Sequence, residues 1–288
     1  MTSSYPSAPL DALDTLWLQV SGTLCNLACT HCFISCSPTN HTHEMMRFES
    51  VMRYLEEAEA LGVKEYYLTG GEPLMHPRIM EILRAALAQG PVSILTNGLL
   101  IRPETAARLK GLSDGSEYSL DLRISIDGYD AATNDPIRGA GTFQRILEGI
   151  RNLAEAGLPP VVTVTEACEG AGTQEGRRRF LELLAEIGLP HPRLKVMPLL
   201  RLGAEETRSR GYLQSETLAG LELTAEQTSE LQCSSCRMAT ERGVWVCPIL
   251  LDVPEARMGA TLADTLRPFE LAYSACHTCH AQGLSCRT

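Results

Sequence analysis

The chain has 288 residues, of which 44% are hydrophobic and 5% aromatic, and a formal net charge of −10. That length allows one large α/β domain with an appendage, or two small domains. The negative charge argues against a long nucleic acid as partner, because binding a phosphate backbone requires clustered Lys and Arg. The densest basic run, 177–179, falls where a helix is expected to begin and is typical of a solvated face.

A second exclusion concerns the membrane. No apolar run approaches the roughly 18 residues that a membrane span requires. The N-terminus has neither the basic region nor the apolar region of a signal peptide. We therefore predict a globular, cytoplasmic protein without membrane contact.

Strand-like and helical segments alternate along the first two thirds of the chain. Apolar or β-rich runs predict strands at 16–20, 65–69, 92–96, 119–127, 161–165 and 193–200. Helical periodicity with terminal Pro and Gly signals predicts helices over 48–61, 77–88, 104–110, 143–156 and 176–187. We expect a parallel sheet covered on both faces, because several strands are almost wholly apolar or β-branched. Either an open doubly wound sheet or a partial TIM barrel satisfies this order, and in both the ligands bind at the C-terminal ends of the strands.

The pattern changes after about residue 203, where no clear alternation of strand and helix continues. We predict two parts, a barrel at 1–203 and a cysteine-bearing module at 204–288. The cysteines support this division, because four of the eleven lie at 25–36 and six lie at 233–286. In a reducing compartment, such clusters indicate metal or redox sites rather than disulfides.

The first cluster has the spacing C-x3-C-x2-C at Cys25, Cys29 and Cys32. Structural zinc sites take four ligands in a closed tetrahedron, usually from C-x2-C pairs. Three thiolates on one loop instead suit a [4Fe–4S] cluster with one iron open to another ligand. The sequence therefore favours iron–sulfur over zinc at this loop.

The polar stretch after this motif contains Cys36, His41 and His43. We interpret it as a solvated lid segment. A mononuclear metal held by these three residues is the alternative.

These motifs together resemble the signature of the radical S-adenosylmethionine (SAM) superfamily. The residues that carry the resemblance are the three spaced cysteines, Phe33, Gly70-Gly71-Glu72-Pro73, Ser125 and Asp127 of ISIDG, and Pro136-Ile137-Arg138-Gly139. The resemblance covers residues 15–200 well and the tail more loosely. It implies a partial (β/α)6 TIM barrel, which decides between the two architectures left open above.

The resemblance also implies roles for individual residues. Three irons would be held by Cys25, Cys29 and Cys32, and SAM would chelate the fourth. Arg138 would pair with the SAM carboxylate, as suits a guanidinium fork. The implied SAM-binding set is Phe33, Gly70, Gly71, Glu72, Pro73, Thr96, Asn97, Ser125, Asp127 and Arg138. One electron, from a donor of the flavodoxin or ferredoxin type, would then yield a 5′-deoxyadenosyl radical that abstracts hydrogen from a substrate.

The tail has six cysteines, in the order Cys233-x2-Cys236-x10-Cys247 and Cys276-x2-Cys279-x6-Cys286. Paired C-x2-C units are typical of zinc modules, so zinc is one interpretation. The resemblance favours an auxiliary [4Fe–4S] cluster in a module of the SPASM or twitch type. The one-cluster form pairs two cysteines that flank a hairpin with a later C-x2-C.

In that layout Cys233, Cys247, Cys276 and Cys279 are the ligands, and 243–247 is the second strand of the hairpin. The two spare cysteines are alternative ligands or part of a second cluster. Full cysteine ligation of the auxiliary cluster favours electron transfer, whereas an open iron favours substrate binding. The sequence does not decide between these roles.

Cys168 lies alone in the loop after the fifth strand. It is either an ordinary loop thiol or a catalytic candidate, as hydrogen donor or substrate contact.

Three functions follow as hypotheses. The first is a radical SAM enzyme acting on a small molecule or short peptide. The second is a maturase of a ribosomally made peptide, although the 24 residues before Cys25 leave no room for the N-terminal recognition domain that such members often carry. The third is a non-catalytic zinc-binding protein.

Overall fold

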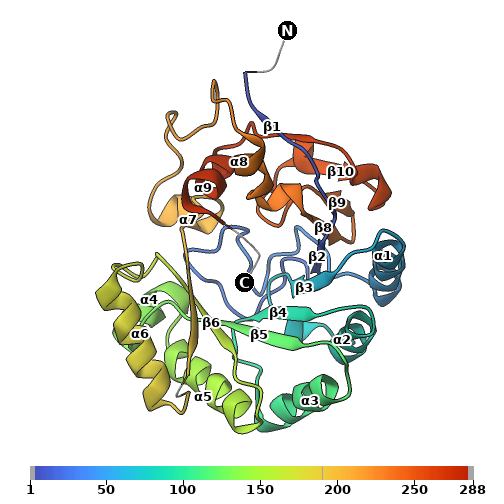
Figure 1. Ribbon diagram of the computed structural model, residues 1–288. Coiled ribbons are helices and arrows are strands. Elements are labelled where there is room, and N and C mark those ends of the chain that lie inside the picture. The colour runs from blue at the N-terminus through green and yellow to red at the C-terminus, as the bar shows by residue number, and fades with distance from the viewer. Residues whose placement is uncertain (1–3, 190, 285–288) are drawn as a thin grey trace.

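The computed structural model describes residues 4–189 and 191–284 (Figure 1). Its centre is a nine-stranded sheet in the order β10-β9-β8-β2-β3-β4-β5-β6-β7. Six consecutive strands of this sheet are parallel. They are β2 (Thr15–Gln19), β3 (Glu65–Thr69), β4 (Val92–Thr96), β5 (Leu120–Ser125), β6 (Val161–Thr165) and β7 (Arg193–Met197). All six predicted strands are thus confirmed, with small differences at their ends.

The predicted helices lie outside these strands (Figure 1). They are α1 (Phe48–Ala60), α2 (Ile79–Leu87), α3 (Pro103–Asp114), α5 (Thr142–Glu155) and α6 (Gln174–Glu186). Each presents an apolar stripe to the sheet, as α1 does with Val51, Leu55 and Ala58. In the described residues β2 pairs with β3 and β8 and not with β7, so the barrel is open. The predicted partial (β/α)6 barrel is confirmed.

Within the barrel, helix α4 (Ala131–Arg138) was not predicted from the sequence. Pro136 lies inside it and lacks the amide that a helical hydrogen bond needs. A capping box formed by Asp130 and Thr133 stabilises its first turn, with Thr133 N donating to Asp130 Oδ1 at 2.8 Å. This helix matters because its last residue is Arg138.

The tail continues the barrel sheet. Strand β8 (Cys236–Thr240) pairs in parallel with β2 and antiparallel with β9 (Gly243–Trp245), which pairs with β10 (Arg257–Gly259). Strand β9 confirms the predicted hairpin. Buried apolar side chains of both parts form one cluster, and the boundary at 203/204 stays a prediction.

The remaining elements are short, apart from the nine-residue α9. They are β1 (Ser7–Ala8) paired with β11 (Phe269–Glu270), α7 (Ala204–Arg208), α8 (Ala225–Ser229), α9 (Ser274–Gln282), and the 3-10 turns η1 (Pro73–Met75), η2 (Gln232–Ser234), η3 (Pro254–Ala256) and η4 (Ala263–Thr265). Across the described ranges, no helix has the length and apolar character needed to cross a bilayer.

Candidate active site

A cavity of about 1330 Å³, open to solvent, lies within the barrel. Its wall includes the last residues of several strands, among them Thr69, Thr96 and Ser125. Ten of the residues predicted to bind cluster or SAM line it: Cys25, Cys29, Cys32, Phe33, Gly70, Gly71, Thr96, Asn97, Ser125 and Arg138. Three others, Glu72, Pro73 and Asp127, are buried outside its lining.

The cysteine loop follows β2 and presents its three thiols to this cavity. Backbone amides point at the sulfurs: Leu27 N donates to Cys25 Sγ at 3.4 Å, and Cys36 N donates to Cys32 Sγ at 3.2 Å. Burial raises the pKa of Cys25 to about 12, whereas the hydrogen bond from Cys36 lowers the pKa of Cys32. Amide donors aimed at sulfur suit thiolates that bind a metal cluster.

The spacing of the thiols also bears on the metal. Among residues 4–189 and 191–284, no three His, Cys, Asp or Glu side chains converge closely enough to hold one ion. A tetrahedral zinc site requires such convergence, whereas each iron of a [4Fe–4S] cluster takes its own thiolate. The donor set therefore suits a cluster.

Gly70 and Gly71 pack against the cysteine loop. A Cβ on Gly70, whose φ is +134°, would lie 2.3 Å from Ser21 Oγ, and a Cβ on Gly71 would lie 2.1 Å from Leu24 O. Gly71 N donates to Gly22 O at 2.8 Å, and Glu72 N donates to Leu24 O at 3.1 Å. The glycine pair thus allows the loop to cross the strand end, in addition to lining the cavity.

Glu72 holds two strand ends together and does not face the cavity. Its Oε1 accepts from Leu74 N at 3.0 Å and from Thr96 Oγ1 at 2.8 Å, and its Oε2 accepts from Asn97 N at 2.8 Å. Burial raises the pKa of this carboxyl group to about 6. Its role in the structure is therefore to position Asn97, whose Nδ2 lies 3.7 Å from Cys25 Sγ.

Asp127 is fully buried, does not line the cavity, and bonds to several residues around it. Its Oδ2 lies 2.6 Å from both Arg138 Nε and His31 Nε2, and its Oδ1 accepts from Thr165 N and Oγ1. The positive charge of Arg138 lowers the pKa of Asp127 despite its burial. The carboxylate of Asp127 thus orients Arg138 and His31, and its contact with SAM stays a prediction.

Sequence reasoning missed part of the cavity wall. These residues are Trp17, Arg123, Thr163, Thr165, Lys195 and Met197. On β5, β6 and β7 they stand two residues apart, so one strand face turns into the barrel. The signal was present as polar residues at alternate positions, for example Thr163 and Thr165 in VVTVT.

The segment predicted as a solvated lid is anchored to the tail. His43 is buried, and its Nε2 lies 2.8 Å from Asp252 Oδ1. Nearby, Glu44 pairs with Arg242 across 2.9 Å. His43 is thus committed to a carboxylate rather than to a metal site with Cys36 and His41.

Cys168 is buried and does not line the cavity. Burial raises the pKa of its thiol. The structure therefore favours the ordinary loop thiol over the catalytic candidate.

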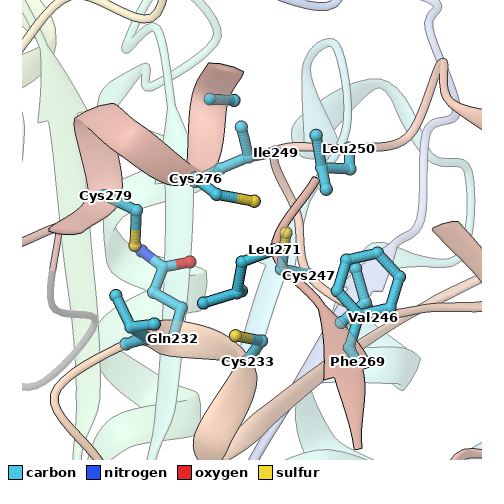
Figure 2. A pocket seen from close by; sticks show the side chains of 12 residues that line it. Gln232, Cys233, Val246, Cys247, Ile249, Leu250, Phe269, Leu271, Cys276 and Cys279 are labelled. Atoms are coloured by element: carbon cyan, nitrogen blue, oxygen red, sulfur yellow. The ribbon is translucent and has the colours of Figure 1, made fainter. Parts of the chain in front are cut away.

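A second pocket, of about 370 Å³, lies in the tail. Figure 2 shows the thiols of Cys233, Cys247, Cys276 and Cys279 turned toward one space lined otherwise mostly by apolar side chains. These are the four ligands that the hairpin layout predicts. Cys236 lies on β8 outside this lining, and Cys286 lies outside the described residues.

Gln232 borders both cavities. The residue is only 8% exposed, and its Oε1 has no hydrogen-bond partner within residues 4–189 and 191–284. Cys279 lines the same pocket as Gln232. Gln232 thus contacts both the four-cysteine pocket and the barrel cavity.

Arg237, at 1% exposure, is buried beside the four-cysteine pocket. Its Nη1 donates to Cys233 O and Cys236 O, both at 2.7 Å, and its Nη2 donates to Thr265 O at 3.0 Å. Burial lowers its pKa, while the thiols of Cys236, Cys233 and Cys247 act in the opposite direction. Within the described part of the chain, the hydrogen bonds of this guanidinium all go to carbonyl groups.

Residues 20–167, just over half of the chain, match the family described as the Radical SAM superfamily, and the chain belongs to that superfamily. This assignment confirms the predicted family and sets aside the non-catalytic zinc protein. A [4Fe–4S] cluster and SAM are the cofactors of this superfamily, as predicted.

Curated relatives match part of the chain. It is 38% identical over 135 residues to mycofactocin maturase MftC of Mycobacterium ulcerans, covering 46% of this chain and 35% of that protein. It is 32% identical over 190 residues to GTP 3′,8-cyclase of Petrotoga mobilis, covering 64% of this chain and 56% of that protein. The chain therefore spans about a third to just over half of the length of these relatives.

Solved structures share the fold. SuiB of Streptococcus suis bound to precursor peptide SuiA superposes with a TM-score of 0.67 at 18% identity, covering 91% of this chain and 65% of that chain. The structure of anSMEcpe with bound AdoMet superposes with a TM-score of 0.64 at 15% sequence identity. The match covers 94% of this chain and 84% of that chain.

Replacing Glu72 by Gln is expected to lower the free energy of unfolding by about 2 kcal/mol, because an amide NH₂ would face a backbone donor. Unfolding in urea measures this loss. Glu56→Gln, at an exposed position of α1, is the control and should change little. Because the pKa of Glu72 rises from 4.5 to about 6 on folding, its contribution should fall as pH rises through that range. If the free energy of unfolding had the same pH dependence in Glu72→Gln and Glu56→Gln, the raised pKa assigned to Glu72 would be wrong.

Proposed function

We propose that the protein is a radical SAM enzyme that abstracts a hydrogen atom from an organic substrate held in the barrel cavity. When bound, the cluster and SAM supply a 5′-deoxyadenosyl radical as the hydrogen acceptor. The observation that supports this best is one cavity that gathers the three spaced thiols, the glycine pair and Arg138.

In this proposal Cys25, Cys29 and Cys32 bind three irons. Arg138 is fixed through Nε by Asp127, which leaves its terminal nitrogens for the SAM carboxylate. Asn97 and Ser125 contribute polar groups to the same wall. The cavity also limits access of water and of side chains to a reactive radical.

The four-cysteine pocket is proposed to hold an auxiliary [4Fe–4S] cluster. Its ligands are Cys233, Cys247, Cys276 and Cys279, which line one pocket. Four cysteines leave no iron open, and this favours electron exchange over direct ligation of the substrate. The position of Gln232 between the two cavities supports exchange with a substrate in the barrel.

The substrate is proposed to be a small molecule or a short peptide. A precursor peptide is the second candidate, because MftC is named a maturase and SuiB was solved with a precursor peptide. An electron donor of the flavodoxin or ferredoxin type and a cytoplasmic location belong to the same proposal.

Anaerobic, reconstituted protein with SAM and dithionite should form 5′-deoxyadenosine, which chromatography quantifies. Cys29→Ala should lower the yield on the order of 100-fold or more, because three thiolates are needed to hold the cluster. Cys168→Ala is the cysteine-matched control and should keep its iron content. A cluster-loaded wild type that never cleaves SAM, with or without cell extract, would count against the proposal.

Iron content distinguishes the auxiliary ligands. Cys276→Ala should lose about half of the bound iron, because each of two [4Fe–4S] clusters contributes equally. Cys236→Ala should keep all of it, because that thiol lies outside the pocket. Loss of iron in Cys236→Ala but not in Cys276→Ala would overturn the ligand assignment.

Arg237→Met should lower the reduction potential of the auxiliary cluster by about 100 mV, because a unit charge several ångströms away in a medium of effective dielectric 20 contributes about 2 kcal/mol. Electron paramagnetic resonance during a redox titration measures this shift. Both proteins should also carry Ala in place of Cys25, Cys29 and Cys32, so that only the signal of the auxiliary cluster remains. The control is Arg257→Met at an exposed position. An unchanged potential in Arg237→Met would rule out electrostatic coupling.

A further inference from the structure

We propose that the substrate carries an anionic group, a carboxylate or a phosphate, that binds to Arg123 on the wall of the barrel cavity. This inference rests on the proposed function, because it places the substrate in the same cavity. It adds the chemical class that the cavity recognises.

Arg123 is a buried cation with neutral partners. It lines the cavity, yet it is only 6% exposed. Its Nη2 donates to Tyr67 Oη at 3.0 Å, and its Cζ lies 4.9 Å from the centre of the Tyr67 ring. Its Nε is buried and finds no hydrogen-bond partner among the described residues. A phenol and a ring face solvate the guanidinium but do not neutralise it, and an uncompensated buried charge is costly.

No ion pair joins Arg123 to a carboxylate of the described residues, and the two acidic residues of its strand region are paired elsewhere. The cavity lining contains no Asp or Glu. Asp121, on the same face of β5, pairs with Arg193 across 2.8 Å. Asp127 pairs with Arg138. The protein side of this cavity therefore retains a net positive charge at Arg123.

The charges of the cofactors must enter this balance. An oxidised [4Fe–4S] core with three thiolates carries one negative charge. SAM that chelates the fourth iron presents a neutral amine, so its sulfonium and its carboxylate cancel. The cavity wall that carries Arg123 also carries Lys195 and no Asp or Glu. A third occupant of the cavity is therefore favoured when it is anionic.

Polar groups beside Arg123 suit an oxyanion. Ser125, Thr163 and Lys195 face one another in register across β5, β6 and β7, and all three line the cavity. On the other side, Tyr67 stacks on Trp17 with 4.4 Å between ring centres, which fixes the ring beneath the guanidinium. A planar, oriented guanidinium binds carboxylate or phosphate in bidentate fashion.

The test measures anion binding to the oxidised, SAM-loaded holoenzyme, which cannot turn over. Inorganic phosphate is followed by its ³¹P line width, and ¹³C-labelled acetate by its ¹³C line width. Saturable line broadening is expected for at least one of the two anions. The anion that binds more tightly identifies the anionic group of the substrate as a phosphate or a carboxylate. Arg123→Met should weaken it on the order of tenfold or more, whereas Arg123→Lys should retain part of the affinity.

The matched control is Arg145→Met, at an exposed position of α5, and its binding should equal that of the wild type. Iron content and SAM affinity show that each variant is folded and loaded. Equal broadening in wild type and Arg123→Met, or no saturation with either anion, would falsify the anion site while the SAM chemistry stands. Failure of the wild type to bind SAM would instead refute the proposed function.

Discussion

The crossing of the cysteine loop over Gly70 and Gly71 is the constraint on which the rest of the site depends. The loop backbone lies where a Cβ of either glycine would be, as close as 2.1 Å to Leu24 O. Any side chain there would lift the loop, and with it Cys25, away from the strand end. Glu72 extends the effect, because its carboxylate ties this strand end to Asn97. The motif thus works first as a steric condition for placing thiols over a sheet, and the chemistry depends on that placement.

Buried charged side chains in this protein have two kinds of partner, an opposite charge or neutral polar groups. Asp127 and Arg138 form a close pair that is neutral without any ligand, so Arg138 keeps its orientation before SAM arrives. Among the described residues, Arg123 and Arg237 have no carboxylate as hydrogen-bond or ion-pair partner. Each lies beside a pocket, and desolvation makes an unpaired cation unfavourable. In the proposals above, the counter-charge of these two cations would come from the substrate and from the auxiliary cluster.

Sequence patterns predicted the barrel because its strands are buried on both faces, and the ends of β3, β4 and β6 agree to the residue. Helix α4 was not predicted because Pro136 usually indicates the end of a helix, whereas here a capping box stabilises the helix around it. Motifs predicted which residues gather at the site, but not the direction of their side chains. Asp127 turns behind the wall because Arg138 and His31 compete for its carboxylate. The importance of Arg123 depends on which carboxylates are already paired, and that follows only from three-dimensional contacts.

The parallel pairing of β8 with β2 determines where the four-cysteine pocket lies relative to the cysteine loop. Thr15 is in register with Cys236, so Gln232 and the four-cysteine pocket lie toward the N-terminal end of β2. The loop that begins at Cys25 leaves from the opposite end of the same strand. A molecule in the cavity therefore lies between the two sites, with Arg123 and Gln232 on its walls. In the proposed function, a substrate anchored at Arg123 would have the cysteine loop toward one end of β2 and the four-cysteine pocket toward the other.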